Sequence, residues 1–293
     1  MILTQQRVYI LPTRAGLLFS ATVLVMLFGC VNYNLGLGYV LTFLMSGVGI
    51  VSILHTFRNL AQLQLNPGRP EPVFAGDAAV FPVLLSNPGG VARLSVGLMP
   101  AGQEPVYADV PAQGTAVVHV RLPAERRGRL PLGRLRVFTT FPLGLFHAWS
   151  NVELDLSCLV YPHPEIGRIS LPPPRAGATE GLETGQGQDD FAGLRRYQRG
   201  DSLRHVAWKA VARGQPVMTK QFSGLAAGEL WLDWDKLPPD LRKEARLSRL
   251  TRWVLDAARA GHACGLRLPS AVIPPGTGPS HQERCLTALA LFR

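Results

Sequence analysis

The chain has 293 residues, of which 47% are hydrophobic and only 17% are charged. Soluble domains typically carry about 25% charged residues, so this composition argues against a wholly soluble protein. The net charge of +10 suits a nucleic acid, an anionic membrane surface or an acidic partner, and by itself selects none of them. The cysteines lie in apolar runs without the close pairing of zinc or redox sites, so we expect buried thiols in a reducing compartment.

An uncharged stretch near the amino terminus predicts a membrane hairpin. No Asp, Glu, Lys or Arg occurs from Ala15 to Phe57, which is enough chain for two helices of about 20 residues each. We predict transmembrane helices over residues 15–31 and 37–57, with turn residues between them: Asn32, Tyr33, Asn34 and Gly36.

The arginines that flank the hairpin predict its orientation. Arg7 and Arg14 precede the first span, Arg58 follows the second, and the turn between the spans is uncharged. By the positive-inside rule, residues 1–14 and the chain after the second span face the cytoplasm, which predicts a multi-pass protein of the bacterial inner membrane. A cleaved signal peptide is the alternative for the first span. Against it, the second span follows at once, and no clear small-residue cleavage site separates the two.

Short alternating or apolar runs separated by turn residues predict an antiparallel β-sandwich over residues 63–164. The runs at 80–85, 115–122 and 134–139 are examples. The segment 128–149 is too apolar for a free loop, so we expect it to pack on the sandwich edge or on the next module.

Proline and glycine are dense over residues 165–188, which is the composition of a linker. After it, residues 189–293 alternate helical and extended patterns, which predicts a small α/β unit. Its expected elements are a helix from about Ser202, strands at 217–222 and 229–233, a helix at 241–260, a strand at 263–268 and a helix at 281–292. Gly261 is placed to stop the first long helix, and Ser280 with Glu283 has the spacing of a capping box for the last.

The most informative segment runs from Asp189 to Arg213 and is rich in arginine. Gly200 permits a tight turn, and Asp201 or Ser202 can accept hydrogen bonds from the first amides of a helix. Apolar residues then follow the spacing of a buried helical stripe and leave a basic side opposite. The stripe is Leu203, Val206, Ala207, Ala210 and Val211, and the basic side carries His205, Lys209 and Arg213. Arg204 and Trp208 are four residues apart and could stack.

Residues Gly193 to Arg213 match, without a gap, the pattern G-L-R-x-Y-x-x-G-D-x-x-R-x-x-x-W-K-x-x-A-R. In this the sequence resembles the family called domain of unknown function 58, and the resemblance extends to the hairpin, the sandwich and the C-terminal region. It implies a membrane-tethered protein encoded with MoxR-type AAA ATPases and with membrane proteins that carry transglutaminase-like or von Willebrand factor type A domains. It also implies that residues 189–293 resemble a truncated von Willebrand factor type A domain.

The metal site of a von Willebrand factor type A domain requires Asp-x-Ser-x-Ser after the first strand, so that hydroxyls and a carboxylate coordinate magnesium. This chain has Asp233, Asp235 and Leu237 at those positions. Because both serines are missing, we expect no bound metal and no cofactor. The alternative is a metal-dependent binding module or cell-envelope enzyme that uses Asp233 and Asp235.

Three histidines lie near a residue that could join them in catalysis. The pairs are His262 with Cys264, His205 with Asp201, and His281 with Cys285. Nothing close to His262 supplies an orienting carboxylate, and His205 lies on the basic side of the predicted helix. We therefore expect no catalytic residue and no enzymatic activity.

The arginine-rich segment has three interpretations. Its arginines could pair internally with Asp189, Asp190 and Asp201, dock an acidic surface of a partner protein, or bind lipid headgroups or nucleic acid. Our leading functional hypothesis is a non-enzymatic inner-membrane adaptor that docks a MoxR-type AAA ATPase or a membrane protein with a transglutaminase-like domain. Nucleic acid is the less favoured partner. The partner-binding residues would be Arg195, Arg196, Tyr197, Asp201, Arg204, Trp208, Lys209 and Arg213.

Overall fold

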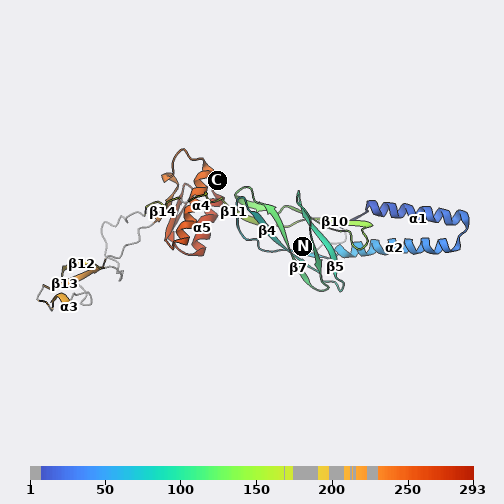
Figure 1. Ribbon diagram of the computed structural model, residues 1–293, viewed down its shortest axis with the longest axis horizontal. Helices are drawn as coiled ribbons and strands as arrows, with labels where there is room; N and C mark the ends of the chain where they lie inside the picture. Colours follow the sequence, from blue (N-terminus) through green and yellow to red (C-terminus); the bar gives the residue numbers. More distant parts are fainter. Residues whose placement is uncertain are drawn as a thin grey trace. The chain divides into compact units, whose positions relative to one another are not determined.

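The computed structural model describes residues 8–167, 169–173, 191–197, 208–211, 213, 216–222 and 230–293. The chain divides into two compact units, Met1–His163 and Pro164–Arg293. The first unit contains a helical hairpin and a set of β-sheets, and the second contains a small sheet with helices (Figure 1).

Two long apolar helices, α1 (Arg14–Tyr33) and α2 (Gly36–Leu60), form the hairpin (Figure 1). Asn34 ends α1 in the left-handed conformation, with φ of 47°, and its amide bonds back to the Cys30 carbonyl. Both helices are long and apolar enough to cross a membrane, and only 11% of the most apolar window of each is buried. The two predicted spans are confirmed as apolar helices, and each helix is longer than predicted.

The rest of the first unit is built from β-sheets. One sheet has the strand order β1-β10-β9-β5-β6, a second has the order β2-β4-β7, and a third has the order β3-β11-β8. The strands are β1 (Tyr9–Pro12), β2 (Gln64–Pro67), β3 (Val73–Phe74), β4 (Ala78–Ser86), β5 (Arg93–Pro100), β6 (Val106–Val110), β7 (Thr115–Pro123), β8 (Gly128–Pro131), β9 (Arg134–Thr139), β10 (Phe146–Glu153) and β11 (Ser157–Tyr161). Neighbouring strands are antiparallel except for β3 and β11, which are parallel.

A shared hydrophobic core holds these sheets together. Along β4, Ala79, Phe81, Val83 and Leu85 are fully buried while the residues between them are partly exposed, as expected for a strand with one face on a core. Side chains of β5, β9 and β10 belong to the same core. The predicted antiparallel sheets are therefore confirmed, and β1, which was not predicted, adds a strand from before the hairpin.

A buried asparagine at the end of α2 joins the hairpin to the sheets. Asn59 Nδ2 donates to the Leu94 carbonyl (2.7 Å) and to Thr139 Oγ1 (2.9 Å), and Asn59 Oδ1 accepts from the Leu94 amide (3.0 Å). The side chain is 4% exposed, so these bonds replace those that water would make. The end of α2 is thereby fixed to β5 and β9.

The second unit contains a three-stranded sheet of order β14-β15-β16. The strands of this sheet and the helices that accompany it are β14 (Leu230–Asp233), the short 3-10 helix η3 (Trp234–Lys236), α4 (Lys243–Arg259), β15 (Cys264–Leu268), β16 (Ala271–Gly276) and α5 (Pro279–Leu291). β14 and β15 are parallel and connected through α4, whereas β16 returns antiparallel to β15. Buried residues of α4 recur at helical spacing: Leu247, Leu250, Val254 and Ala257.

Most of the elements predicted for this unit are confirmed to within about two residues at each end. Gly261 has φ of +69° just after α4, as expected for a helix stop. The predicted capping box is wrong, because Gly278 precedes α5 and Ser280 lies inside the helix, after Pro279. β16 was not predicted. The predicted helix from Ser202 begins outside the described residues, and the structure describes α3 (Trp208–Val211) within its range.

Residues just after the unit boundary are attached to α4. Glu165 accepts two hydrogen bonds from Arg249, at 2.8 and 3.0 Å, and its amide donates to the Ser248 carbonyl (3.1 Å). Trp253 Nε1 donates to the Ser170 carbonyl (3.1 Å). The start of the segment with linker composition therefore lies along α4. The Arg249 hydrogen bonds hold the pKa of Glu165 below its ordinary value.

We expect the Glu165→Gln variant to lose about 0.5–1 kcal/mol of the stability of the second unit at pH 7, since the ion pair is partly solvent-exposed. The folded-state pKa of Glu165 lies below its unfolded value, so its contribution is present above the unfolded pKa and is lost as the pH falls through the folded pKa. The difference between wild type and variant should therefore shrink in acid. Urea unfolding at pH 7 and at acid pH measures it, with Glu283→Gln on exposed α5 surface as the control.

Candidate functional site

The described part of the arginine-rich segment begins on one strand of a two-stranded sheet. This strand, β12 (Phe191–Arg196), pairs antiparallel with β13 (Met218–Phe222), which follows the segment in the sequence. The pairing continues past β12, because the Tyr197 amide donates to the Val217 carbonyl (3.0 Å). The predicted strand at 217–222 is confirmed. The motif therefore starts on a strand, which was not predicted, and this strand pairs with one that follows the motif in the sequence.

The structure describes six of the eight predicted partner-binding residues. Arg195 and Arg196 lie on β12, Tyr197 follows it, Trp208 and Lys209 lie on α3, and Arg213 lies in a turn. The side chains of Arg196 and Arg213 are exposed, Trp208 is 59% exposed, and Tyr197 is half-buried. Arginine and tryptophan are the residue types that most often anchor protein interfaces.

The remaining predicted residues, Asp201 and Arg204, lie outside the described residues. So do Asp189 and Asp190, the proposed internal partners of the arginines. Internal pairing of the motif therefore stays a prediction, as does partner docking.

Asp233 ends β14, at the position of the alternative metal site. Its Oδ1 accepts from the Asp235 amide (3.2 Å), and its Oδ2 lies 3.5 Å from Arg267 Nη1. The guanidinium of Arg267 also lies 5.0 Å from the centre of the Trp231 ring. Both carboxylate oxygens of this buried aspartate are thus engaged by groups of the chain. Among the described residues, no cluster of three His, Cys, Asp or Glu side chains could hold a metal ion.

His281 and Cys285 are brought together on α5, where Cys285 Sγ lies 3.5 Å from His281 Nε2. The same Nε2 lies 2.6 Å from the Cys264 carbonyl, and His281 Nδ1 lies 3.2 Å from Arg284 Nη2. A carbonyl only accepts and a guanidinium only donates, so Nε2 carries the proton and Nδ1 accepts. In this tautomer Nε2 cannot take a proton from the thiol. Burial raises the pKa of Cys285 to about 12, so the thiol stays protonated.

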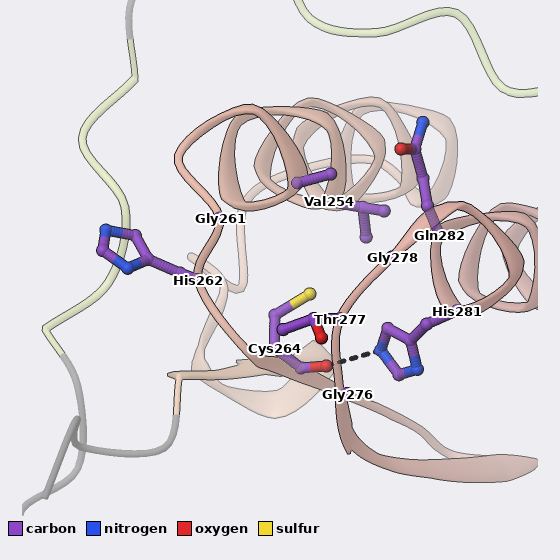
Figure 2. Close-up of a pocket in the computed structure, with 10 residues that line it drawn as sticks. Val254, Gly261, His262, Cys264, Gly276, Thr277, Gly278, His281 and Gln282 are labelled. Carbon is purple, nitrogen blue, oxygen red and sulfur yellow. Dashed lines mark hydrogen bonds between the residues drawn. The ribbon is translucent and has the colours of Figure 1, made fainter. Parts of the chain in front are cut away.

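A small pocket lies between the end of α4 and the start of α5 (Figure 2). Figure 2 shows the Cys264 thiol directed into it, His281 bonded to the Cys264 carbonyl at one side, and His262 pointing away at the other. Burial raises the pKa of the Cys264 thiol, which disfavours a reactive thiolate. The lining is formed by Val254, Ala258, Gly261, His262, Cys264, Gly276, Thr277, Gly278, His281 and Gln282. The side chains of the candidate pair His262 and Cys264 point to different sides, since His262 is exposed and Cys264 is buried (Figure 2).

Sequence reasoning missed Arg267 as the partner of Asp233. The parallel pairing of β14 and β15 sets the two residues opposite each other. Pairing the predicted strands 229–233 and 263–268 side by side, in register at their carboxyl ends, would have found this contact.

Comparisons with known proteins find a family model that matches the C-terminal part of the chain. Residues 193–293 match the family model described as "Protein of unknown function DUF58". A solution NMR structure of the CARDB domain of a Pyrococcus furiosus protein is 16% identical, with a TM-score of 0.21, over 31% of this chain and 92% of that one. No curated protein matches the sequence.

Proposed function

We propose that the protein, whose residues 193–293 match the DUF58 family model, is a non-enzymatic membrane adaptor that docks a partner protein. Its hairpin would anchor it in the bacterial inner membrane, and its arginine-rich motif would bind the partner. The proposed membrane anchoring is supported by the apolar surface of α1 and α2. The proposed docking of a partner is supported by the exposure of Arg196, Trp208 and Arg213.

The apolar surface of the hairpin calls for a lipid environment. Large side chains on both helices are exposed, among them Leu18 (71%), Val25 (70%), Phe28 (70%) and Phe43 (65%). Soluble monomers rarely expose contiguous apolar patches of more than a few hundred Å², so water is a poor solvent for this surface. Arg14 and Arg58 lie at the ends of the helices away from the uncharged turn, which supports cytoplasmic positions for both termini.

The exposed part of the motif supports docking of an acidic partner surface. Guanidinium groups form paired hydrogen bonds with carboxylates, and an exposed tryptophan provides a large apolar contact. The family resemblance implies the partner, a MoxR-type AAA ATPase or a membrane protein with a transglutaminase-like domain. In this proposal the α/β unit resembles a truncated von Willebrand factor type A domain, and it supports the motif without a metal ion.

Charge reversal in the motif should weaken the complex with the ATPase. In the variant Arg196→Glu with Arg213→Glu, we expect the fraction of ATPase that co-purifies with the detergent-solubilised protein to fall roughly tenfold or more, since like charges would oppose the acidic surface. The matched control is Arg121→Glu with Arg129→Glu, which makes the same charge change at exposed positions of β7 and β8. Equal co-purification by both variants would argue against docking through the motif.

The orientation has its own measurement. A carboxyl-terminal reporter that is active only in the cytoplasm should be active in cells, because both ends of the hairpin are proposed to face inward. Activity restricted to a periplasmic reporter would rule out contact with a cytoplasmic ATPase.

A further inference from the structure

The apolar segment that joins β9 to the first residue of β10 is bonded to both helices of the hairpin. Residues 140–146, with the sequence TFPLGLF, contain no charged side chain. Thr13, which caps α1, donates through Oγ1 to the Gly144 carbonyl (2.6 Å), and its amide donates to the Leu145 carbonyl (2.9 Å). Thr56 of α2 donates through Oγ1 to the Phe141 carbonyl (2.8 Å). We call residues 140–146 the rim loop.

These bonds fix the level of the rim loop along the hairpin. α1 has 20 residues, which at a rise of about 1.5 Å per residue gives a length of about 30 Å. Thr56 lies about the same distance from Gly36, the first residue of α2. The hydrocarbon core of a bilayer is also about 30 Å thick. If the turn marks one boundary of the hydrocarbon, Thr13 and Thr56 mark the other, and the rim loop lies level with them.

The rim loop turns apolar side chains outward at this level. Leu143 at its tip is 55% exposed, and Pro142 is also exposed, whereas Leu145 is buried. Leu11, on the neighbouring strand β1, is 58% exposed and pairs with His147 just after the loop. The backbone at the tip is constrained, since the Gly144 amide donates to the Thr140 carbonyl (2.8 Å). The tip of the loop is therefore uncharged, apolar and held in one conformation by a bond within its own backbone.

We propose that the rim loop is a third membrane contact, with Leu143 and Leu11 inserted into the lipid interface on the side where the hairpin enters. The occupant of this surface is phospholipid, because the loop is continuous with the lipid-facing surface of α1 and α2 and carries no charge for a polar partner. This inference rests on the proposed crossing of the membrane by the hairpin. It adds that the β-sheets contact the bilayer surface through the rim loop and are not attached to the membrane by the helices alone.

The experiment uses the full chain in nanodiscs of phosphatidylcholine and phosphatidylglycerol. A single cysteine is introduced at Leu143 and labelled with a small fluorophore, and quenching is measured with lipids that carry a nitroxide near the top of the acyl chain. The native cysteines are buried, and the unsubstituted protein measures any background labelling. The matched control is Val117→Cys, at a 52% exposed apolar position on β7 of the other sheet.

We expect lipid nitroxide to quench the label at position 143 roughly threefold more than the label at position 117, as for a side chain at the headgroup boundary. Equally weak quenching at both positions would overturn the proposal. Protection of position 143 from a water-soluble quencher without quenching by lipid would also overturn it, since that result indicates a protein contact.

A label at a third position tests the membrane hairpin separately from the rim-loop contact. Val25 is 70% exposed on α1, and a label on Val25→Cys should be quenched by nitroxide deeper in the acyl chain. Quenching at position 25 but not at position 143 would refute the rim-loop contact and leave the membrane hairpin standing. Absence of quenching at position 25 would refute both.

Discussion

The Asn59→Leu variant is expected to lose about 3 kcal/mol of stability, a large effect for a single substitution. Leucine fills a similar volume but cannot make the three hydrogen bonds to Leu94 and Thr139. The amide and carbonyl of Leu94 would be left without these partners, and each buried unpaired group costs about 1–3 kcal/mol. Denaturant unfolding of the detergent-solubilised chain, followed by tryptophan fluorescence, measures the loss.

An exposed asparagine in the sheet that Asn59 contacts provides the control for this prediction. Asn151 on β10 is solvent-exposed and accepts only a long bond from Arg136 (3.5 Å). Asn151→Leu should change the stability by less than about 0.5 kcal/mol. If the two variants were equally stable, the bonds of Asn59 could not be what holds α2 to the sheets.

The second large effect is expected at Gly16, where α1 meets the rim loop. A Cβ at Gly16 would overlap the Leu145 carbonyl oxygen, which is backbone and cannot turn away as a side chain could. We expect Gly16→Ala to cost about 1–3 kcal/mol, as overpacked sites do, even though alanine otherwise favours a helix over glycine. Thermal unfolding in detergent measures the change.

Gly29 lies on the same helix and is the matched control. A Cβ there would meet nothing within 4 Å, so Gly29→Ala should be neutral or stabilising by up to about 1 kcal/mol. Opposite signs for the two glycines are the expected result. A stabilising Gly16→Ala would mean that α1 and the rim loop are not in contact.

The hairpin was predictable because its signal is local. An uninterrupted apolar run of the right length identifies α1 and α2 whatever they contact. Their ends were less predictable, since α2 continues past Phe57 through Asn59, whose partners lie on β5 and β9. Polar residues at the end of an apolar run do not reveal a partner that is distant in the sequence.

Two of the strands that were not predicted, β1 and β16, were missed for different reasons. β1 has only four residues, and its partner β10 lies far along the chain, so neither length nor a nearby turn signals it. β16 contains Pro274 and Pro275, which argue against a strand. Proline is tolerated there because β16 is the last strand of its sheet and one of its edges needs no donor.

The candidate site was predictable as a motif but not as a geometry. The spacing of arginine, tyrosine, aspartate and tryptophan singled out residues 193–213, and the family match covers that segment. The pairing of β12 with β13 depends on a strand that lies outside the motif, which no spacing within the motif encodes. In the same way, the pairing of Asp233 with Arg267 follows from the register of β14 and β15. The sequence pattern around Asp233 alone could not predict it.

The attachment of both helices to one β-sheet unit has a mechanical consequence. Thr13, Thr56 and Asn59 anchor the hairpin at separate points, so helices and strands behave as a single lever. If the hairpin crosses the bilayer as proposed, a sideways force on the strands would tilt the helices within roughly 30 Å of lipid. The lipid around both helices would resist that tilt, so the force would reach the membrane as a change in helix angle.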